Sequence, residues 1–202
     1  MSSIAIMGGT FDPIHYGHLV AAEQVRHEFQ CEQVLFIPAS IPPHKDKRLI
    51  SPVVHRLAMT QMAVVTNDYF TVSTLEIDRS GPSYTIDTVK AVKEKYNPDN
   101  LYFITGADAV LEIISWKNVE QLLSACNFVA ATRPGYDISN LQHKLDGLPG
   151  EHLRKIISIY IPALAISSTD IRRRVHKGEP IKYLLPEPVE HYIKKNNLYK
   201  EV

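Results

Sequence analysis

The chain has 202 residues, which is enough to bury a sizeable core and is within the usual range for one domain. Its 22 lysine and arginine residues balance 22 acidic residues, and this zero formal charge excludes a broad positive field for nucleic acid or an anionic membrane. The two cysteines, Cys31 and Cys126, form no Cys-x-x-Cys pair, which excludes a zinc ribbon or disulfide framework and predicts two buried free thiols.

The apolar runs are short throughout the chain. None approaches the roughly 20 residues that span a bilayer, and no basic leader precedes a long apolar region. We therefore expect a cytoplasmic protein without membrane or nucleic-acid partners, made of one domain over residues 1–202 with a C-terminal helical part from about residue 166. The sequence leaves a homo-oligomer open.

The first strand, expected at residues 4–7, leads into Gly8-Gly9-Thr10-Phe11-Asp12-Pro13 and then His15-x-Gly17-His18. The glycines let backbone N–H groups approach a ligand, and a helix at residues 18–29 presents its own N–H groups, which is typical of a phosphate site. Because Gly17 places no side chain between the imidazoles, both can stabilise negative charge on one ligand. Helix-cap residues or half of a metal site are the alternatives, but no further His or Cys stands at a metal-binding spacing.

The second strand, expected at residues 33–38, would form a parallel crossover unit with the first. It ends in a proline-rich loop that carries His44 and Lys45. This loop lies at the end of the strand where α/β proteins bind ligands, so its basic residues can reach a phosphate. On local sequence alone a solvated loop is equally open.

Residues 51–65 have a helical pattern, with Ser51 as the expected cap. The residues expected to face the core are Leu57, Met59, Met62 and Val65. A strand is expected at residues 70–77, and another helix begins near Ser83-Tyr84-Thr85 and ends near residue 96. Ser83 or Thr85 can be an ordinary cap, but this is also a second helix N-terminus that can meet an anion.

The strand expected at residues 101–105 runs into Gly106 and Asp108. Gly106 permits close approach of the backbone, and the Asp108 carboxylate suits ribose hydroxyls or caps a helix. Trp116, the only tryptophan, follows a short helix and is in most proteins a packing residue.

Strands are expected at residues 127–132, which end before Arg133, and at residues 156–161. The helix that follows begins at Ser167-Ser168-Thr169, where Ser167-x-x-Asp170 fits a capping box. A cap does not explain the run from Arg172 to Arg174, because cations in the opening turns of a helix oppose its macrodipole, at a cost of about 0.3–1 kcal/mol each. A bound polyphosphate would explain them. A terminal helix over residues 187–198 is expected to cover the core.

The turn at residues 8–18 and the pattern Ser168-Thr169-x-Ile171-Arg172 resemble the nucleotidyltransferases that carry a His-x-Gly-His motif. Over essentially the whole chain, the sequence resembles the bacterial nicotinate-nucleotide adenylyltransferases. The resemblance implies a Rossmann-like α/β fold, doubly wound, with a mostly parallel sheet flanked by helices. It also implies transfer of an adenylyl group from ATP, with Mg²⁺, to nicotinate mononucleotide in NAD biosynthesis.

The resemblance also implies roles for particular residues. The loop with Lys45 contacts phosphate, the Ser83-Tyr84-Thr85 turn binds the nicotinate carboxylate, and Trp116 stacks on the pyridine ring. We expect the catalytic residues to be His15, His18, Lys45 and Arg172. The expected ATP-binding residues are Gly8, Gly9, Thr10, Phe11, His15, His18, Gly106, Ser167, Ser168, Thr169 and Arg172. The expected mononucleotide-binding residues are His44, Lys45, Ser83, Tyr84, Thr85, Asp108, Trp116 and Arg133.

Other functions remain open at this point. Related enzymes that act on pantetheine phosphate or glycerol phosphate share the His-x-Gly-His motif but would not require Trp116 or the Ser83-Tyr84-Thr85 turn. An NAD-dependent dehydrogenase is disfavoured because Thr10 stands where a Gly-x-Gly-x-x-Gly loop needs glycine. A non-catalytic nucleotide sensor would bind ATP but release no pyrophosphate.

Overall fold

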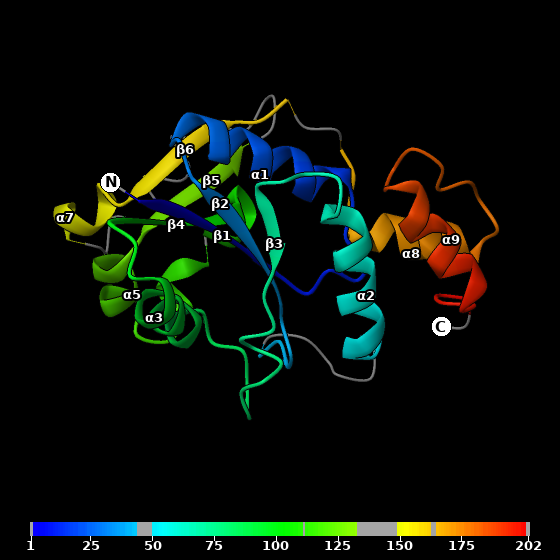
Figure 1. Cartoon of the computed structure of the whole chain (residues 1–202), viewed down its shortest axis with the longest axis horizontal. Coiled ribbons are helices and arrows are strands. Elements are labelled where there is room, and N and C mark those ends of the chain that lie inside the picture. Colours follow the sequence, from blue (N-terminus) through cyan, green and yellow to red (C-terminus); the bar gives the residue numbers. More distant parts are fainter. Residues whose placement is uncertain (1, 44–49, 111, 133–148, 163–164, 201–202) are drawn as a thin grey trace.

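The computed structural model describes residues 2–43, 50–110, 112–132, 149–162 and 165–200 (Figure 1). Within these residues, six strands form one parallel sheet in the order β3-β2-β1-β4-β5-β6. The strands are β1 (Ser3–Gly9), β2 (Gln33–Pro38), β3 (Phe70–Val72), β4 (Asn100–Gly106), β5 (Asn127–Thr132) and β6 (Ile156–Tyr160). This order confirms the doubly wound fold. Its direction of winding reverses between β1 and β4, so a crevice opens at the carboxyl ends of these two strands.

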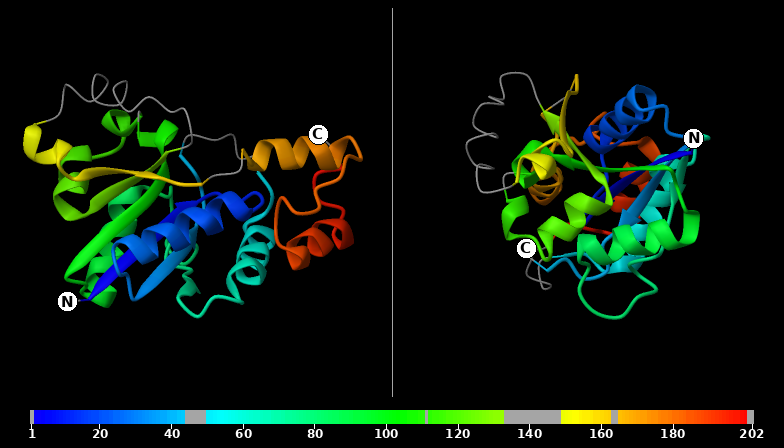
Figure 2. Two further views of the ribbon diagram at one scale, coloured as in Figure 1. Left: turned by 90° about the horizontal axis from the view of Figure 1, so that it is seen from above. Right: turned by 90° about the vertical axis from the view of Figure 1, so that its left-hand side faces the viewer.

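The helices cover both faces of the sheet and its carboxyl end. They are α1 (Tyr16–Glu28), α2 (Val53–Val64), α3 (Thr85–Tyr96), α4 (Ala107–Val110), the 3-10 helix η2 (Ile113–Ser115), α5 (Val119–Ala125), α7 (Gly150–Leu153), α8 (Ser168–His176) and α9 (Glu187–Lys195). Helix α1 lies on one face, and α3 and α5 lie on the other (Figure 1). Helices α2, α8 and α9 gather beyond the carboxyl end of β1 (Figure 2).

Side chains along β1 alternate between two cores, as the period of a strand requires. Ala5 and Met7 join the core under α1, which continues into α2, α8 and α9. Ile4 and Ile6 join the core under α3 and α5. Because both faces of the sheet are buried, its strands read as continuous apolar runs in the sequence.

Both cysteines are buried and free, as expected. Burial raises the pKa of the Cys31 thiol to about 11 and that of the Cys126 thiol to about 12, so both thiols stay protonated at neutral pH. Within the described parts of the chain, no helix has both the length and the apolar character needed to cross a bilayer.

Several local expectations were wrong. The strand expected at residues 70–77 ends at Val72, because a turn follows in which the Asp78 N–H donates to the Thr74 carbonyl at 2.8 Å. In α2 the N-cap is Pro52 rather than Ser51, and Val65 is 74% exposed. The last helix ends at Lys195, and the short helices α4, α5 and α7 were not expected.

Candidate active site

The turn between β1 and α1 is built around a buried aromatic ring. Phe11 is 2% exposed and has a positive φ of 50°. A Cβ atom on Gly9 would lie 2.9 Å from the Phe11 ring, and one on Gly8 would lie 2.8 Å from the Phe103 ring. The two glycines therefore make room for aromatic packing, a reason that differs from the ligand approach expected from the sequence.

His15 and His18 lie side by side at the start of α1. Their rings are stacked with centroids 3.8 Å apart, and a Cβ atom on Gly17 would lie 3.0 Å from the His15 ring, as expected for a glycine that removes bulk there. The His15 N–H donates to His18 Nδ1 at 3.3 Å. Because Nδ1 accepts, the neutral His18 ring carries its proton on Nε2.

The N-terminus of α1 has fewer backbone N–H groups available for a ligand than its sequence predicts. A helix leaves four N–H groups without partners in the helix ladder, here those of residues 15–18. Three of these have other partners: His15 N–H donates to His18 Nδ1, Tyr16 N–H to the Leu184 carbonyl and His18 N–H to the His15 carbonyl. A ligand at this turn would consequently depend more on imidazole donors than on backbone amides.

Helix α8 packs its N-terminus against the same turn. Ser167 caps the helix by accepting from the Asp170 N–H at 3.1 Å, and Ser168 Oγ donates to the Pro13 carbonyl at 2.8 Å. Arg172 Nη1 donates to the Asp12 carbonyl at 2.7 Å. The two motifs that stand about 150 residues apart in the sequence are thus joined by hydrogen bonds.

The three arginines of α8 do not share one role. Arg173 and Arg174 lie in the last turn of α8, where cations favour the helix macrodipole, so the expected electrostatic penalty was wrong for them. Both bind the Asp170 carboxylate, at 2.6 Å each, which turns that side chain away from a reciprocal capping box. These two pairs hold the pKa of Asp170 below its usual range. Arg172 is the arginine that contacts the turn.

A cavity of about 350 Å³ lies between α1, α8 and the carboxyl ends of β4 and β5, a volume within the usual range of ligand pockets. Its lining combines apolar and polar residues. Its lining residues are Met7, His15, Gly17, His18, Ala21, Ile104, Thr105, Gly106, Ala131, Thr132, Ile161, Ile166, Ser167, Ser168 and Thr169. The structure therefore brings both histidines, Gly106 and the N-terminus of α8 around one space.

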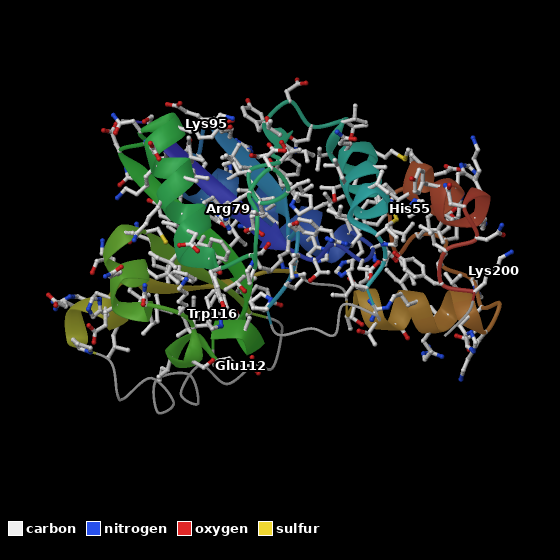
Figure 3. The ribbon with its side chains drawn as sticks, turned by 90° about the horizontal axis from the view of Figure 1, so that it is seen from below. His55, Arg79, Lys95, Glu112, Trp116 and Lys200 are labelled. Carbon is white, nitrogen blue, oxygen red and sulfur yellow. The ribbon has the colours of Figure 1, made fainter. Side chains whose placement is uncertain are left out.

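A second group of predicted residues lies on the α3 side of the sheet, where Figure 3 shows Trp116. The Trp116 ring meets Phe103 and Phe128 edge-on, with centroids 6.4 and 5.9 Å apart. The next residue, Lys117, places its Nζ 4.2 Å from the centre of the Tyr84 ring. Tyr84 and the region of Trp116 are therefore neighbours, as a shared mononucleotide site requires.

Ser83 does not cap α3. The N-cap of α3 is Tyr84, and Ser83 Oγ instead accepts from the N–H groups of Ser40 at 2.9 Å and Ile41 at 3.3 Å. The hydroxyl therefore fastens the start of the loop that follows β2. The sequence could not show this, since the two partners are more than 40 residues away.

Three predicted site residues, His44, Lys45 and Arg133, lie outside the described residues. Asp108 lies in α4, and the structure does not describe its side chain. Thr85 is the first residue of α3, and Thr10 lies in the turn after β1. Among the described residues, no group of three or more His, Cys, Asp or Glu is arranged to hold a metal ion.

Sequence reasoning missed Arg56, which is 1% exposed and is held by four backbone carbonyl oxygens. Its guanidinium donates to the carbonyls of Thr10 and Ala39 at 2.8 and 2.7 Å, and of Ser40 and Ser51 at 3.3 and 2.9 Å. Burial lowers the pKa of Arg56, and the nearby Asp12 carboxylate opposes that shift. A signal was present, because Arg56 shares its helix face with the buried Met59 and Ala63.

The sequence matches the family model described as cytidylyltransferase-like over residues 6–174. A relative from Thermoanaerobacter sp. (strain X514), named probable nicotinate-nucleotide adenylyltransferase, is 57% identical over 199 residues, which are 98% of this chain and 94% of the relative. A relative of the same name from Moorella thermoacetica is 54% identical over 198 residues, which are 98% of this chain and 91% of the relative.

Solved structures of similar fold include the Plasmodium falciparum nicotinic acid mononucleotide adenylyltransferase complexed with APC and with NaAD. They superpose with TM-scores of 0.76 and 0.77, each at 24% sequence identity and covering 99% of this chain and 98% of that chain. At this identity the likeness shows the shared fold.

Proposed function

The chain belongs to the cytidylyltransferase-like family, and on this premise we propose that it transfers the adenylyl group of ATP to nicotinate mononucleotide. The products are nicotinate adenine dinucleotide and pyrophosphate, in NAD biosynthesis. The structural observation that supports this proposal is the cavity into which His15 and His18 and the N-terminus of α8 project together. The names of the relatives support the same reaction.

The proposed reaction is a direct displacement. A phosphate oxygen of the mononucleotide attacks the α-phosphorus of ATP, an O–P bond forms, and the bond from the α-phosphorus to the bridging oxygen breaks to release pyrophosphate. The second pKa of a phosphate monoester is about 6, so the nucleophile is already ionised and needs no general base. The enzyme's task is to align two anions and to neutralise the charge that develops between them.

Four residues are proposed for that charge. His18 can donate from Nε2 and, with His15, is proposed to support the triphosphate in the cavity that both residues line. Arg172, which already contacts the turn, and Lys45 are proposed to complete the cationic surroundings. Mg²⁺ is proposed to arrive with ATP and to supply further positive charge at the phosphates. The apolar residues that line the cavity suit the nucleoside part of ATP.

The mononucleotide is proposed to bind on the other side of β1 and β4. Trp116 offers an aromatic ring for the pyridine, and the first turn of α3 at Ser83-Tyr84-Thr85 offers amides for the nicotinate carboxylate. The remaining proposed contacts are His44, Lys45, Asp108 and Arg133. Because both substrates belong to the cell's pool of nucleotides, we also propose a cytoplasmic location.

The test is to incubate the protein with ATP and Mg²⁺ and, in separate reactions, nicotinate mononucleotide, nicotinamide mononucleotide, pantetheine phosphate and glycerol phosphate. We expect the dinucleotide and one equivalent of pyrophosphate with nicotinate mononucleotide. Binding of ATP without pyrophosphate release would instead identify a nucleotide sensor. Labelling of the protein by ATP carrying a radioactive α-phosphate would contradict direct displacement.

A further inference from the structure

The C-terminal segment reaches back to the turn that presents the two histidines. Tyr199 Oη donates to Asp12 Oδ1 at 2.7 Å across 187 residues of sequence. The other carboxylate oxygen, Asp12 Oδ2, accepts from the Ser51 N–H at 3.1 Å. Asp12 is 4% exposed, so both hydrogen bonds are sheltered from water and are stronger than similar bonds at the surface.

The turn is held at its backbone from two directions. Arg56 binds the carbonyl of Thr10, while Arg172 and Ser168 bind the carbonyls of Asp12 and Pro13. These donors belong to α2 and α8. The Asp12 carboxylate is the attachment that faces the C-terminal segment, so the hydroxyl of Tyr199 adds a third direction of support.

Two contacts couple the position of this turn to the orientation of the His18 ring. The Phe11 ring, next to Asp12, meets the His18 ring edge-on with centroids 5.2 Å apart. His15, three residues after Asp12, donates from its N–H to His18 Nδ1. A shift of Asp12 therefore moves both neighbours that fix the orientation of the His18 ring.

Tyr199 is itself fixed on both sides. The Leu198 N–H donates to the Ile193 carbonyl at 3.1 Å, and His176 Nδ1 donates to the Lys200 carbonyl at 3.1 Å. Figure 3 shows Lys200 on the side of the molecule where α8 and α9 lie. Burial, and then the Asp12 charge, raise the pKa of Tyr199, so its hydroxyl remains a protonated donor at neutral pH.

We propose that Tyr199 is a positioning residue for adenylyl transfer, which acts through Asp12 to hold His18 in its working orientation. This inference rests on the function proposed above. With this role for Tyr199, the segment after α9 contributes to a site that is formed mainly by the β1–α1 turn and α8. A displacement of about 1 Å at a reacting group can cost up to about a hundredfold in rate, so loss of a single hydroxyl at this point has a measurable effect.

The first test compares Tyr199→Phe with Tyr192→Phe. Tyr192 is the matched control, because its hydroxyl bonds to His55 Nδ1 at 3.0 Å between α9 and α2 and not to the turn. We expect kcat to fall about tenfold in Tyr199→Phe, with KM for ATP within about twofold, and both constants within about twofold in Tyr192→Phe. Equal kinetics of the two variants would overturn the proposal, and thermal unfolding would show whether both lost similar stability.

The second test asks whether Tyr199 acts through Asp12. We compare Asp12→Ala with the double variant that also carries Tyr199→Phe. Once the carboxylate is gone, removal of the hydroxyl should not lower kcat further. If the fold-decreases in kcat of the two single variants multiply in the double variant, Tyr199 acts by another route and the proposal is overturned. If Asp12→Ala fails to fold, Asp12→Leu, which has a similar size and no hydrogen-bond acceptor, takes its place in the cycle.

A third measurement does not depend on activity. The imidazole ¹⁵N resonances of His18, assigned by comparison with His18→Gln, should shift in Tyr199→Phe and stay unchanged in Tyr192→Phe. Unchanged resonances in Tyr199→Phe would overturn the positioning role. Absence of dinucleotide product with the wild-type protein would refute the proposed function alone, and these resonances would still decide the role of Tyr199.

Discussion

The contact between His15 and His18 decides which nitrogen of His18 can serve a ligand. His18 Nδ1 accepts from the His15 N–H, so a neutral ring has its hydrogen-bond donor at Nε2. The stacked His15 ring and the edge of the Phe11 ring restrict rotation of His18. A donor that is fixed before the ligand arrives can stabilise charge in the transition state without reorganisation.

The His18→Ala variant tests this interpretation. We expect kcat to fall by about 10²–10³, because one fixed donor to the developing charge is lost. ATP affinity, measured by calorimetry, should change by less than about tenfold, since the cavity proposed to hold the nucleotide is retained. His27→Ala, an exposed histidine on the same helix, serves as the control and should behave as wild type. Near-normal turnover of His18→Ala would remove His18 from the chemistry.

Arg56 binds four carbonyl oxygens while fully buried, so its loss leaves several acceptors without partners. We expect Arg56→Met to lower the free energy of unfolding by about 3 kcal/mol in urea denaturation, because charged hydrogen bonds contribute about 1.5–3 kcal/mol each and the desolvation cost of the buried guanidinium offsets a large part of their sum. Arg154→Met, at an exposed position, should stay within about 0.5 kcal/mol. A loss below about 1 kcal/mol for Arg56→Met would contradict the structural role that we give to this residue.

Glu76 predicts a dependence of stability on pH. Burial raises the pKa of its carboxyl group, although the hydrogen bond that Thr88 Oγ1 donates to it at 2.6 Å acts to lower that pKa. The folded state thus holds this proton more tightly than the unfolded chain, so stability is greatest below the ordinary pKa and is lost as pH rises through the raised pKa.

The variant Glu76→Gln cannot ionise, so the stability lost by the wild type on raising the pH should be retained. We expect its free energy of unfolding, relative to wild type, to increase between about pH 4 and pH 8 in urea titrations. The exposed Glu28→Gln is the control and should show no such trend. A difference that does not change with pH would show that Glu76 has no raised pKa.

At the scale of elements, α8 connects the cavity to the rest of the protein through its first turn. Ser167 satisfies the Asp170 N–H, and Ser168 reaches the Pro13 carbonyl. Asp170 then binds Arg173 and Arg174, whose positions in the last turn agree with the helix macrodipole. Arg172 is left to contact the β1–α1 turn, and the position of that residue depends on how well α8 begins.

Removal of the cap in Ser167→Ala should therefore affect both stability and activity. We expect a loss of about 1 kcal/mol in unfolding free energy, typical of an N-cap, and a decrease in kcat/KM for ATP because Ser167 lines the cavity. Ser124→Ala is the control, since its exposed hydroxyl donates to the Glu120 carbonyl inside α5. Unchanged unfolding of Ser167→Ala, compared with Ser124→Ala, would contradict the capping role.

At the scale of the molecule, the C-terminal helices are continuous with the main core. Ile171, Ile181 and Val189 belong to the same buried cluster as Met7 and Met59. The C-terminal part expected from about residue 166 is thus packed against α2 and the β1–α1 turn, which supports the proposal of a single domain.

We accordingly expect one cooperative unfolding transition. Calorimetry should give equal calorimetric and van't Hoff enthalpies, and the circular dichroism and Trp116 fluorescence transitions should coincide. Trp116 reports on the core under α3, while circular dichroism reports on all helices. Two separated transitions would instead mean that α8 and α9 unfold independently of the sheet.

Much of the fold could be predicted because its signals are local. The buried runs that became β2 and β5 have the bounds expected from the sequence, residues 33–38 and 127–132. The length of β3 was overestimated, at residues 70–77 instead of Phe70–Val72. A short alternating pattern also fits a turn whose side chains face inward. Val65 was expected to face the core but is exposed. It is the C-cap residue that follows the last turn of α2, and a residue at a helix end need not lie on the buried face.

The sequence by itself determined the alternation of strands and helices and the placement of His15 and His18 on one turn, because spacing over a few residues controls both. Only the tertiary structure decided that Ser83 fastens the loop after β2, that Arg56 binds four carbonyls and that Tyr199 reaches Asp12. These polar groups can bind any of several partners. Which partner each group binds depends on which distant segments the packed core brings within about 3 Å of it, and a local sequence pattern does not indicate that distance.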